Sequence, residues 1–315
     1  MLINKLILYR RLIVSKIIHK NKKSFQPKRI VLILLFYINS YIASKMAKKY
    51  PQVGTFVFDY TSQVINLYGR LSNEDLTLIM SYLSKNFKSF EKRNVIDVGA
   101  NIGNHSIFFS DYFEKVYAYE PYPPIFELLK FNSKFVCKRQ NIYPKMIGLS
   151  DKKKSLKFEV NFSHFGQSKI IDNKINSKNL ISINVDKLDN IYKDINKVEL
   201  IKIDVEGHEL MVLKGAKQII KKNKPYILFE QHIKEITNGS SKSIDFLKSL
   251  GYRFAAVEKN LYFGNSLFGR IVSSILRLFS GHRLQLVETN NFKKIFYNNI
   301  LAIPKNKYHE FINYS

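Results

Sequence analysis

From residue 93 onward, short runs rich in valine and isoleucine alternate with longer stretches of helical character. The apolar runs are nearly continuous, as in parallel strands that are buried on both faces. Strands that alternate with helices imply right-handed crossover connections and a mostly parallel sheet. The sequence therefore predicts a doubly wound α/β fold. Strands are expected near 94–98, 115–120, 142–149, 156–160, 180–185, 198–204, 226–230, 253–258 and 299–303, and helices near 104–112, 124–135, 209–222 and 241–250.

The composition fits one such domain with an appendage. The chain has 315 residues, of which 45% are hydrophobic, enough for a sizeable core. A formal net charge of +26 attracts phosphate groups or anionic lipid, although a sequence rich in lysine, asparagine and isoleucine is also expected of an AT-rich genome. The single cysteine, Cys137, cannot form an internal disulfide, which predicts a reducing compartment and a cytoplasmic protein.

The first 58 residues contain no acidic residue, and two apolar runs at 2–18 and 30–43 lie among their basic residues. The second run has about 14 residues, fewer than the roughly 20 that a bilayer-spanning helix needs. We therefore expect a basic, apolar helical N-terminal extension over 1–53, followed by one domain over 54–315. The extension either rests on an anionic membrane surface, which makes the protein peripheral to a membrane, or packs on the domain as a helical layer.

A second basic amphipathic segment interrupts the alternation near 264–285. Leucine, isoleucine and phenylalanine recur there at three- and four-residue spacing among arginine and histidine residues, which predicts a helix. Such a helix, inserted before the last strand, can close over a site, touch a membrane, or lie on the surface without a special role.

The motif at 95–103 is the sharpest local signal, because an apolar strand runs directly into a glycine-bearing turn and then a helix. In open α/β sheets, ligands bind beyond the carboxyl ends of the strands where the strand order reverses. Gly99 and Gly103 lack the Cβ atoms that would block a close approach. Asp97, near the end of the strand, can orient the turn or face a cationic ligand.

Glu120 ends the next strand, about 20 residues after Gly99, the separation that places an acid on ribose hydroxyls in nucleotide-binding folds. A nicotinamide dinucleotide site requires glycine at the first, third and sixth positions of the turn, and here Asn101 and Asn104 occupy the last two. A nucleoside ligand without phosphates, such as S-adenosylmethionine, suits the acidic turn better because its sulfonium is positive.

The motif at 200–209 is a buried strand that ends in two acids, a glycine and a histidine. Several ionisable groups at the carboxyl end of a strand indicate a catalytic cluster. We therefore predict Asp204, Glu206 and His208 as catalytic residues. The alternative is a structural helix start, with Asp204 as the cap and Glu209 favoured by the helix dipole.

These motifs resemble those of the FkbM-type methyltransferases. The resemblance covers roughly residues 54–305 and is most specific at 96–103 and 201–209. Glu120-Pro121 and the segments 148–151, 188–189 and 299–304 support it. The first 50 residues and the segment 264–285 lie outside it.

The resemblance implies a class I methyltransferase fold with a seven-stranded sheet and S-adenosylmethionine as the methyl donor. It also implies O-methylation of an acceptor hydroxyl on a sugar, a glycolipid or a secondary metabolite. Glu120 would hold the ribose, the turn after Asp97 the methionine and sulfonium, and Leu149 with Ser150 the adenine. The cofactor-binding residues implied are Asp97, Gly99, Ala100, Asn101, Gly103, Glu120, Pro121, Leu149, Ser150 and Asp204.

Methyl transfer to an alcohol is a one-step displacement in which the acceptor must lose a proton. We expect His208, Glu206 or Asp204 to take that proton. Asp204 and Glu206 can also bind Mg²⁺, but nothing in their spacing requires a metal, and none is predicted. The other histidines near the motifs, including His232, are expected to be structural, and the polar loop at 164–168 is a candidate for acceptor binding.

Two alternative functions remain open. The charge favours a nucleic-acid methyltransferase, but the Asp/Asn-Pro-Pro-aromatic motif of base-methylating families is missing after the strand at 198–204, so a nucleic-acid partner is not expected. A non-catalytic, membrane-peripheral interaction protein could also retain this fold.

Overall fold

The computed structural model describes residues 17–20, 34, 37–38, 41, 74–86, 92–162, 164–171, 179–192, 197–260, 267–280 and 283–313. Most of the predicted extension over 1–53, and its boundary with the following domain, lie outside these residues. None of the helices in the described ranges has both the length and the apolar character needed to cross a membrane.

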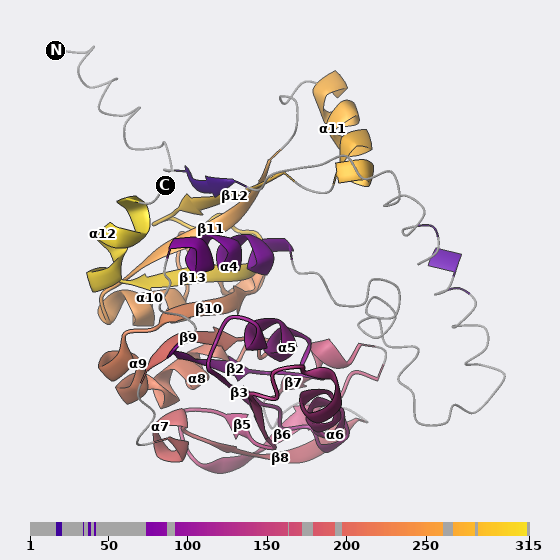
Figure 1. Cartoon of the computed structure of the whole chain (residues 1–315), viewed down its shortest axis with the longest axis vertical. Helices are drawn as coiled ribbons and strands as arrows, with labels where there is room; N and C mark the ends of the chain where they lie inside the picture. The colour runs from indigo at the N-terminus through magenta and orange to yellow at the C-terminus, as the bar shows by residue number, and fades with distance from the viewer. Residues whose placement is uncertain are drawn as a thin grey trace.

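The centre of the described structure is a nine-stranded sheet in the order β1-β12-β11-β13-β10-β9-β2-β3-β4 (Figure 1). In that order, the strands span Ile17–Lys20, Arg283–Glu288, Tyr252–Asn260, Tyr297–Pro304, Tyr226–Gln231, Val198–Ile203, Asn94–Val98, Lys115–Tyr119 and Ile142–Lys145. The five strands from β10 to β4 pair in parallel, and β13 runs antiparallel to both β10 and β11. The order reverses at β2, so the predicted doubly wound, mostly parallel sheet of class I methyltransferase type is confirmed.

The predicted number of seven strands is wrong for this sheet. β12 pairs antiparallel with β11, and β1 pairs antiparallel with β12. Without them β11 would present a long unpaired edge, which proteins normally cover. Neither strand was predicted from the sequence. β1 lies in a basic stretch expected to be helical, and β12 begins within the segment predicted as a helical insertion.

The single strand expected near 142–149 is instead two short strands in two sheets. β4 pairs with β3, whereas β5 (Gly148–Leu149) pairs with β8 (Leu180–Asp186). A second, four-stranded sheet has the order β5-β8-β6-β7, with β6 at Lys154–Glu159 and β7 at Lys169–Ile170. Phe158, Ile183 and Val185 of this sheet form a small core with Ile125 and with Val160, which follows β6.

Helices cover both faces of the main sheet, as the alternation of strand side chains requires. Val95 and Leu200 belong to one core, which includes residues of α4 (Glu74–Asn86), α5 (Asn104–Ser110) and α12 (Lys305–Asn313). Ile96 and Ile201, one residue further along each strand, belong to the opposite core. That core includes residues of α8 (Glu209–Gly215), α9 (Lys217–Asn223) and α10 (Lys242–Ser249), so the helix expected over 209–222 is two helices.

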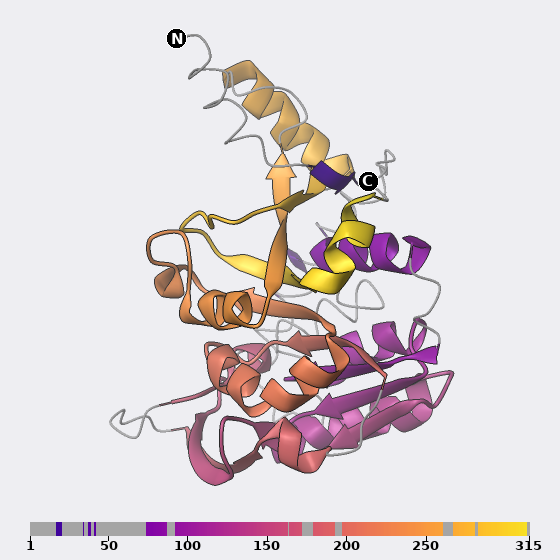
Figure 2. The same cartoon turned by 90° about the vertical axis from the view of Figure 1, so that its left-hand side faces the viewer.

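Two further helices lie at opposite ends of the molecule. α6 (Pro123–Phe131), continued by a turn of π-helix at Asn132–Val136, follows β3. α11 (Leu267–Ser280) lies in the segment expected to be helical, at the end far from α5 and α6 (Figures 1 and 2). Its exposed residues include Leu267, Phe268, Ile271 and Ile275. Contact of this helix with a membrane stays a prediction.

The turn after β2 packs against the end of β9 without room for a side chain. Gly99 has a φ of +77°, and a Cβ built there would lie 1.8 Å from the carbonyl oxygen of Asp204. Gly251 has a similar φ of +81°, but a Cβ there would meet nothing within 4 Å. A comparison of alanine substitutions at Gly99 and Gly251 therefore separates the cost of a left-handed backbone from the cost of steric overlap.

We expect Gly251→Ala to lower the free energy of unfolding by about 1 kcal/mol, from the left-handed backbone alone. Gly99→Ala should cost about 1–3 kcal/mol more, because the β2 turn and the end of β9 must move apart. Chemical denaturation of both variants measures the difference. Equal losses would show that this close approach is unimportant for stability.

Candidate active site

A pocket of about 540 Å³ opens at the carboxyl ends of the parallel strands, where the strand order reverses at β2. Val98 and Tyr119 line it from the ends of β2 and β3, and Asp204 and Glu230 line it from β9 and β10. The second sheet and the loop before β7 close another side through Phe158, His164, Gly166, Gln167, Ser168 and Ile170. The volume falls in the range typical of small-molecule sites.

Glu120 lies in the wall of this pocket and is held by backbone amides. The N–H of Asn101 donates to Glu120 Oε2 at 3.1 Å, and the N–H of Tyr122 donates to Oε1 at 2.9 Å. Asn101 reaches this position with a left-handed φ of +51°. Burial raises the pKa of Glu120 to about 7. The carboxylate keeps further lone pairs that can accept hydroxyl hydrogens.

Beneath the turn, a buried lysine joins the two strands that carry the first and third motifs. Lys202 Nζ lies 2.9 Å from Asp204 Oδ2 and 3.8 Å from Asp97 Oδ1. The hydroxyl of Ser106 donates to the other Asp97 oxygen at 2.6 Å. Asp97 is fully buried, so it supports the turn and does not line the pocket.

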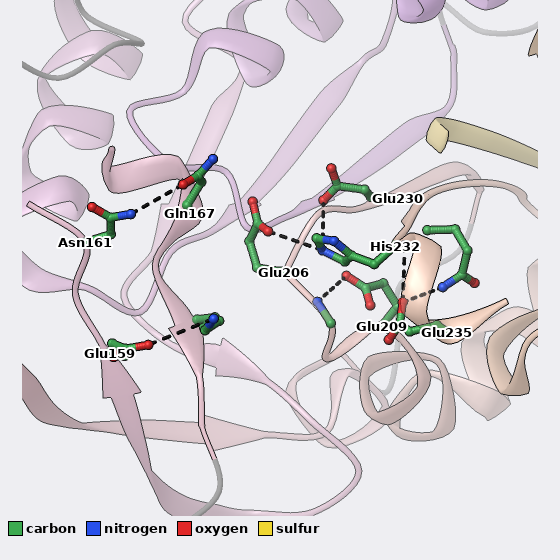
Figure 3. Close-up of polar contacts among 11 residues, drawn as sticks. Glu159, Asn161, Gln167, Glu206, Glu209, Glu230, His232 and Glu235 are labelled. Atoms are coloured by element: carbon green, nitrogen blue, oxygen red, sulfur yellow. Dashed lines mark hydrogen bonds and ion pairs between the residues drawn. The ribbon is translucent and has the colours of Figure 1, made fainter. Parts of the chain in front are cut away.

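The pocket wall also carries two glutamates and a histidine (Figure 3). Glu206 Oε2 lies 3.3 Å from His232 Nε2, and Glu230 Oε2 lies 4.0 Å from the same nitrogen. Burial and the charge of Asp204 raise the pKa of Glu206 to about 7. Burial, with the charges of Asp204 and Glu206, raises the pKa of Glu230 to about 9. This wall is therefore rich in closely spaced acids.

Most of the residues predicted from the sequence meet at this pocket. The ones that line it are Gly99, Ala100, Asn101, Glu120, Pro121, Leu149, Asp204 and Glu206. The predicted residues Asp97, Gly103, Ser150 and His208 are not among the lining residues. Gly103 precedes α5 and has a φ of +91°.

His208 and Ser150 contact each other outside the pocket. His208 Nε2 lies 2.9 Å from Ser150 Oγ. Burial lowers the pKa of His208 to about 4, so its ring is neutral near pH 7. The catalytic role expected for His208 stays a prediction, and of the two residues only Glu206 lines the pocket.

Sequence reasoning missed Glu230 and treated His232 as structural, yet both line the pocket. The available signal was their position, because Glu230-Gln231-His232 follows an apolar run next to the strand that ends at Ile203. The polar loop predicted as a candidate for acceptor binding does line the pocket, through His164, Gln167 and Ser168.

The sheet order and the pocket at its switch point define a fold of class I methyltransferase type. A sequence model described as the methyltransferase FkbM domain matches residues 97–254, half of the chain. The protein therefore belongs to the FkbM methyltransferase family, as its motifs indicated.

One curated relative is the hexuronic acid methyltransferase AglP of Haloferax volcanii, 31% identical over 143 residues. The match covers 43% of this chain and 54% of AglP, so the chain spans about half the length of this relative. A solved FkbM methyltransferase from Methylobacillus flagellatus is 16% identical, with a TM-score of 0.36 over 80% of this chain and 60% of the other. A solved SAM-dependent O-methyltransferase from Thermotoga maritima is 12% identical, with a TM-score of 0.40 over 78% and 70%.

We expect Lys202→Met to lower the free energy of unfolding by about 3–5 kcal/mol, because it leaves Asp97 and Asp204 without their buried countercharge. Lys130→Met is the control, since Lys130 pairs with Glu127 on the surface and should contribute less than about 1 kcal/mol. Denaturation of both variants at neutral pH measures the contrast. Similar losses would contradict a central role for Lys202.

Proposed function

We propose that this protein transfers the methyl group of S-adenosylmethionine to a hydroxyl of a sugar-containing acceptor. The observation that carries the proposal is Glu120, an acid at the carboxyl end of β3 that lines the pocket beside the turn at Gly99. Two backbone amides fix its carboxylate. An acid in this position suits the two ribose hydroxyls of a nucleoside ligand.

The rest of the pocket fits the remaining parts of the donor. Leu149, Ile125 and Phe158 give an apolar surface for the adenine. The turn at Gly99 and Ala100 lets the ligand approach the backbone closely. The negative carboxylate of Asp204 would attract the positively charged sulfonium. When bound, S-adenosylmethionine supplies an electrophilic methyl group, and the chain's residues then have to orient the acceptor oxygen and receive its proton.

A hydroxylated acceptor is supported by the remaining polar lining of the pocket, where Glu206, His232, His164 and Ser168 offer groups that hydrogen-bond to hydroxyls. Glu206 is the best placed of the predicted bases, since His208 does not line the pocket and Asp204 is engaged by Lys202. The similarity to a hexuronic acid methyltransferase supports a sugar acceptor.

The first test of the donor site is the pH dependence of S-adenosylmethionine binding. Glu120 has a pKa of about 7, and it must be ionised to accept two ribose hydroxyls. A proton competes with the donor below that value, so the dissociation constant for S-adenosylmethionine should rise about tenfold from pH 8 to pH 6. Titration calorimetry at both pH values measures this change.

Glu120→Gln should weaken donor binding at pH 8 and remove most of the pH dependence. Glu127→Gln, an exposed change on α6, is the matched control and should bind like the wild type. A Glu120→Gln variant with unchanged affinity would rule out the ribose role. Failure of the wild-type protein to bind the donor would instead favour the non-catalytic alternative.

The second test concerns the acceptor side and uses labelled donor with extracts of the host's glycans, lipids and RNA. We expect label in a glycan or glycolipid fraction, and Glu206→Gln should lower turnover by about 10²–10⁴-fold, as for loss of a general base. His208→Ala should stay close to wild type. Label in RNA would establish the nucleic-acid alternative, and an equal loss in His208→Ala would restore the histidine as the base.

A further inference from the structure

We propose that Glu206, Glu230 and His232 form a binding site for one divalent transition cation, such as Mn²⁺ or Zn²⁺. The site would lie in the wall of the same pocket that Glu120 lines, and nothing in the sequence required it. Cation binding is argued from these three side chains alone. Its contribution to catalysis, given below, rests on the proposed methyl transfer.

The spacing of the three side chains suits one ion. One ligand atom from each side chain lies within 4.8 Å of the other two. The two distances to His232 Nε2 are 3.3 Å from Glu206 and 4.0 Å from Glu230. Ligand atoms on one ion with bonds of about 2.1 Å lie roughly 3.0–3.4 Å apart in octahedral or tetrahedral geometry. A small movement of the Glu230 side chain therefore completes the set.

Two of the three ligand atoms have no hydrogen-bond partner among the described residues. These atoms are Glu230 Oε2 and His232 Nε2, and both are shielded from solvent. The Glu230 side chain as a whole is only 13% exposed. Buried side-chain polar atoms are paired in the large majority of cases. Two buried atoms that lack a hydrogen bond, although each lies within 4.0 Å of another atom of the cluster, are suited to share a cation.

The surrounding charge also favours a cation. Asp204, Glu206, Glu209 and Glu230 act electrostatically on one another. The buried cation nearest to them, Lys202, is bonded to Asp204 and lies near Asp97. It is engaged by these two aspartates, so a bound cation would be the group that relieves the crowding of the Glu206 and Glu230 carboxyls.

The donor set indicates the type of ion. Two carboxylates and an imidazole suit Mn²⁺, Zn²⁺ and related ions, whereas Mg²⁺ and Ca²⁺ prefer oxygen ligands throughout. Three protein ligands leave coordination positions open, as in catalytic sites. An acceptor hydroxyl bound at such a position would have a lowered pKa. Glu206 would bind the ion through one carboxylate oxygen, and its other oxygen would receive the acceptor's proton. An acceptor with two neighbouring oxygens, such as a vicinal diol or a hydroxy acid, fits best.

The competing explanation is a protonated His232 that forms ion pairs with both glutamates. The two explanations differ in whether the metal-free protein takes up a cation. We would treat the full chain with chelator, remove the chelator, and titrate Mn²⁺ by calorimetry and by the loss of the free Mn²⁺ paramagnetic resonance signal. One equivalent should bind, and Zn²⁺ should displace it.

Substitutions test whether the cation binds at these three residues. His232→Ala and Glu230→Gln should each weaken Mn²⁺ binding at least about tenfold. The matched controls are His309→Ala on α12 and Glu127→Gln on α6, both exposed and outside the cluster, and they should bind Mn²⁺ like the wild type. S-adenosylmethionine binding by each variant shows that the pocket is still folded.

Absence of stoichiometric Mn²⁺ and Zn²⁺ binding, in protein that binds the methyl donor, would overturn the cation site and leave the proposed function intact. Binding that the two cluster variants do not weaken would also overturn it. Cation binding in a protein that does not bind the donor would have the opposite meaning, supporting the site while contradicting the methyltransferase proposal.

Discussion

The ion pairs made by Lys202 are the constraint on which the site depends. The lysine is the second-to-last residue of β9, between Ile201 and Ile203, and is 2% exposed. Such a position is tolerable only where opposite charges compensate the loss of water. Here Asp97 of β2 and Asp204 after β9 provide those charges. The lysine thus ties the glycine turn to the loop that carries Glu206, with the Gly99 backbone packed against the carbonyl oxygen of Asp204.

The pocket therefore has two groups of ionisable side chains, Glu120 on one side and Glu206, Glu230 and His232 on the other. On the side of β3, Glu120 lines the pocket and is held by backbone amides. On the side of β10, Glu206 and Glu230 surround His232, and their carboxylates have raised pKa values. The two sides meet because the strand order reverses at β2, which leaves a crevice at the carboxyl ends of β2 and its neighbours. The methyl group to be transferred would pass between them.

The sequence predicted those features that depend on neighbours along the chain. Gly99 and Glu120 were found because a strand, a turn and the next strand follow one another directly. Glu230 and His232 were not, because their nearness to Glu206 depends on the pairing of β10 with β9. His208 shows the reverse case, since it stands near Glu206 in sequence while the start of α8 places it beside Ser150. The strand β12 was not predicted, because it begins within a segment whose apolar residues recur at helical spacing.

The central claim is that the crevice between β2 and β3 holds the nucleoside of a methyl donor with its ribose on Glu120. A crystal structure of the protein with S-adenosylhomocysteine, the product of methyl transfer, tests this most directly. We expect both ribose hydroxyls on the Glu120 carboxylate, the adenine against Leu149, and the sulfur facing Asp204 and Glu206. Electron density for the nucleoside anywhere else, or an empty crevice at saturating ligand, would contradict it.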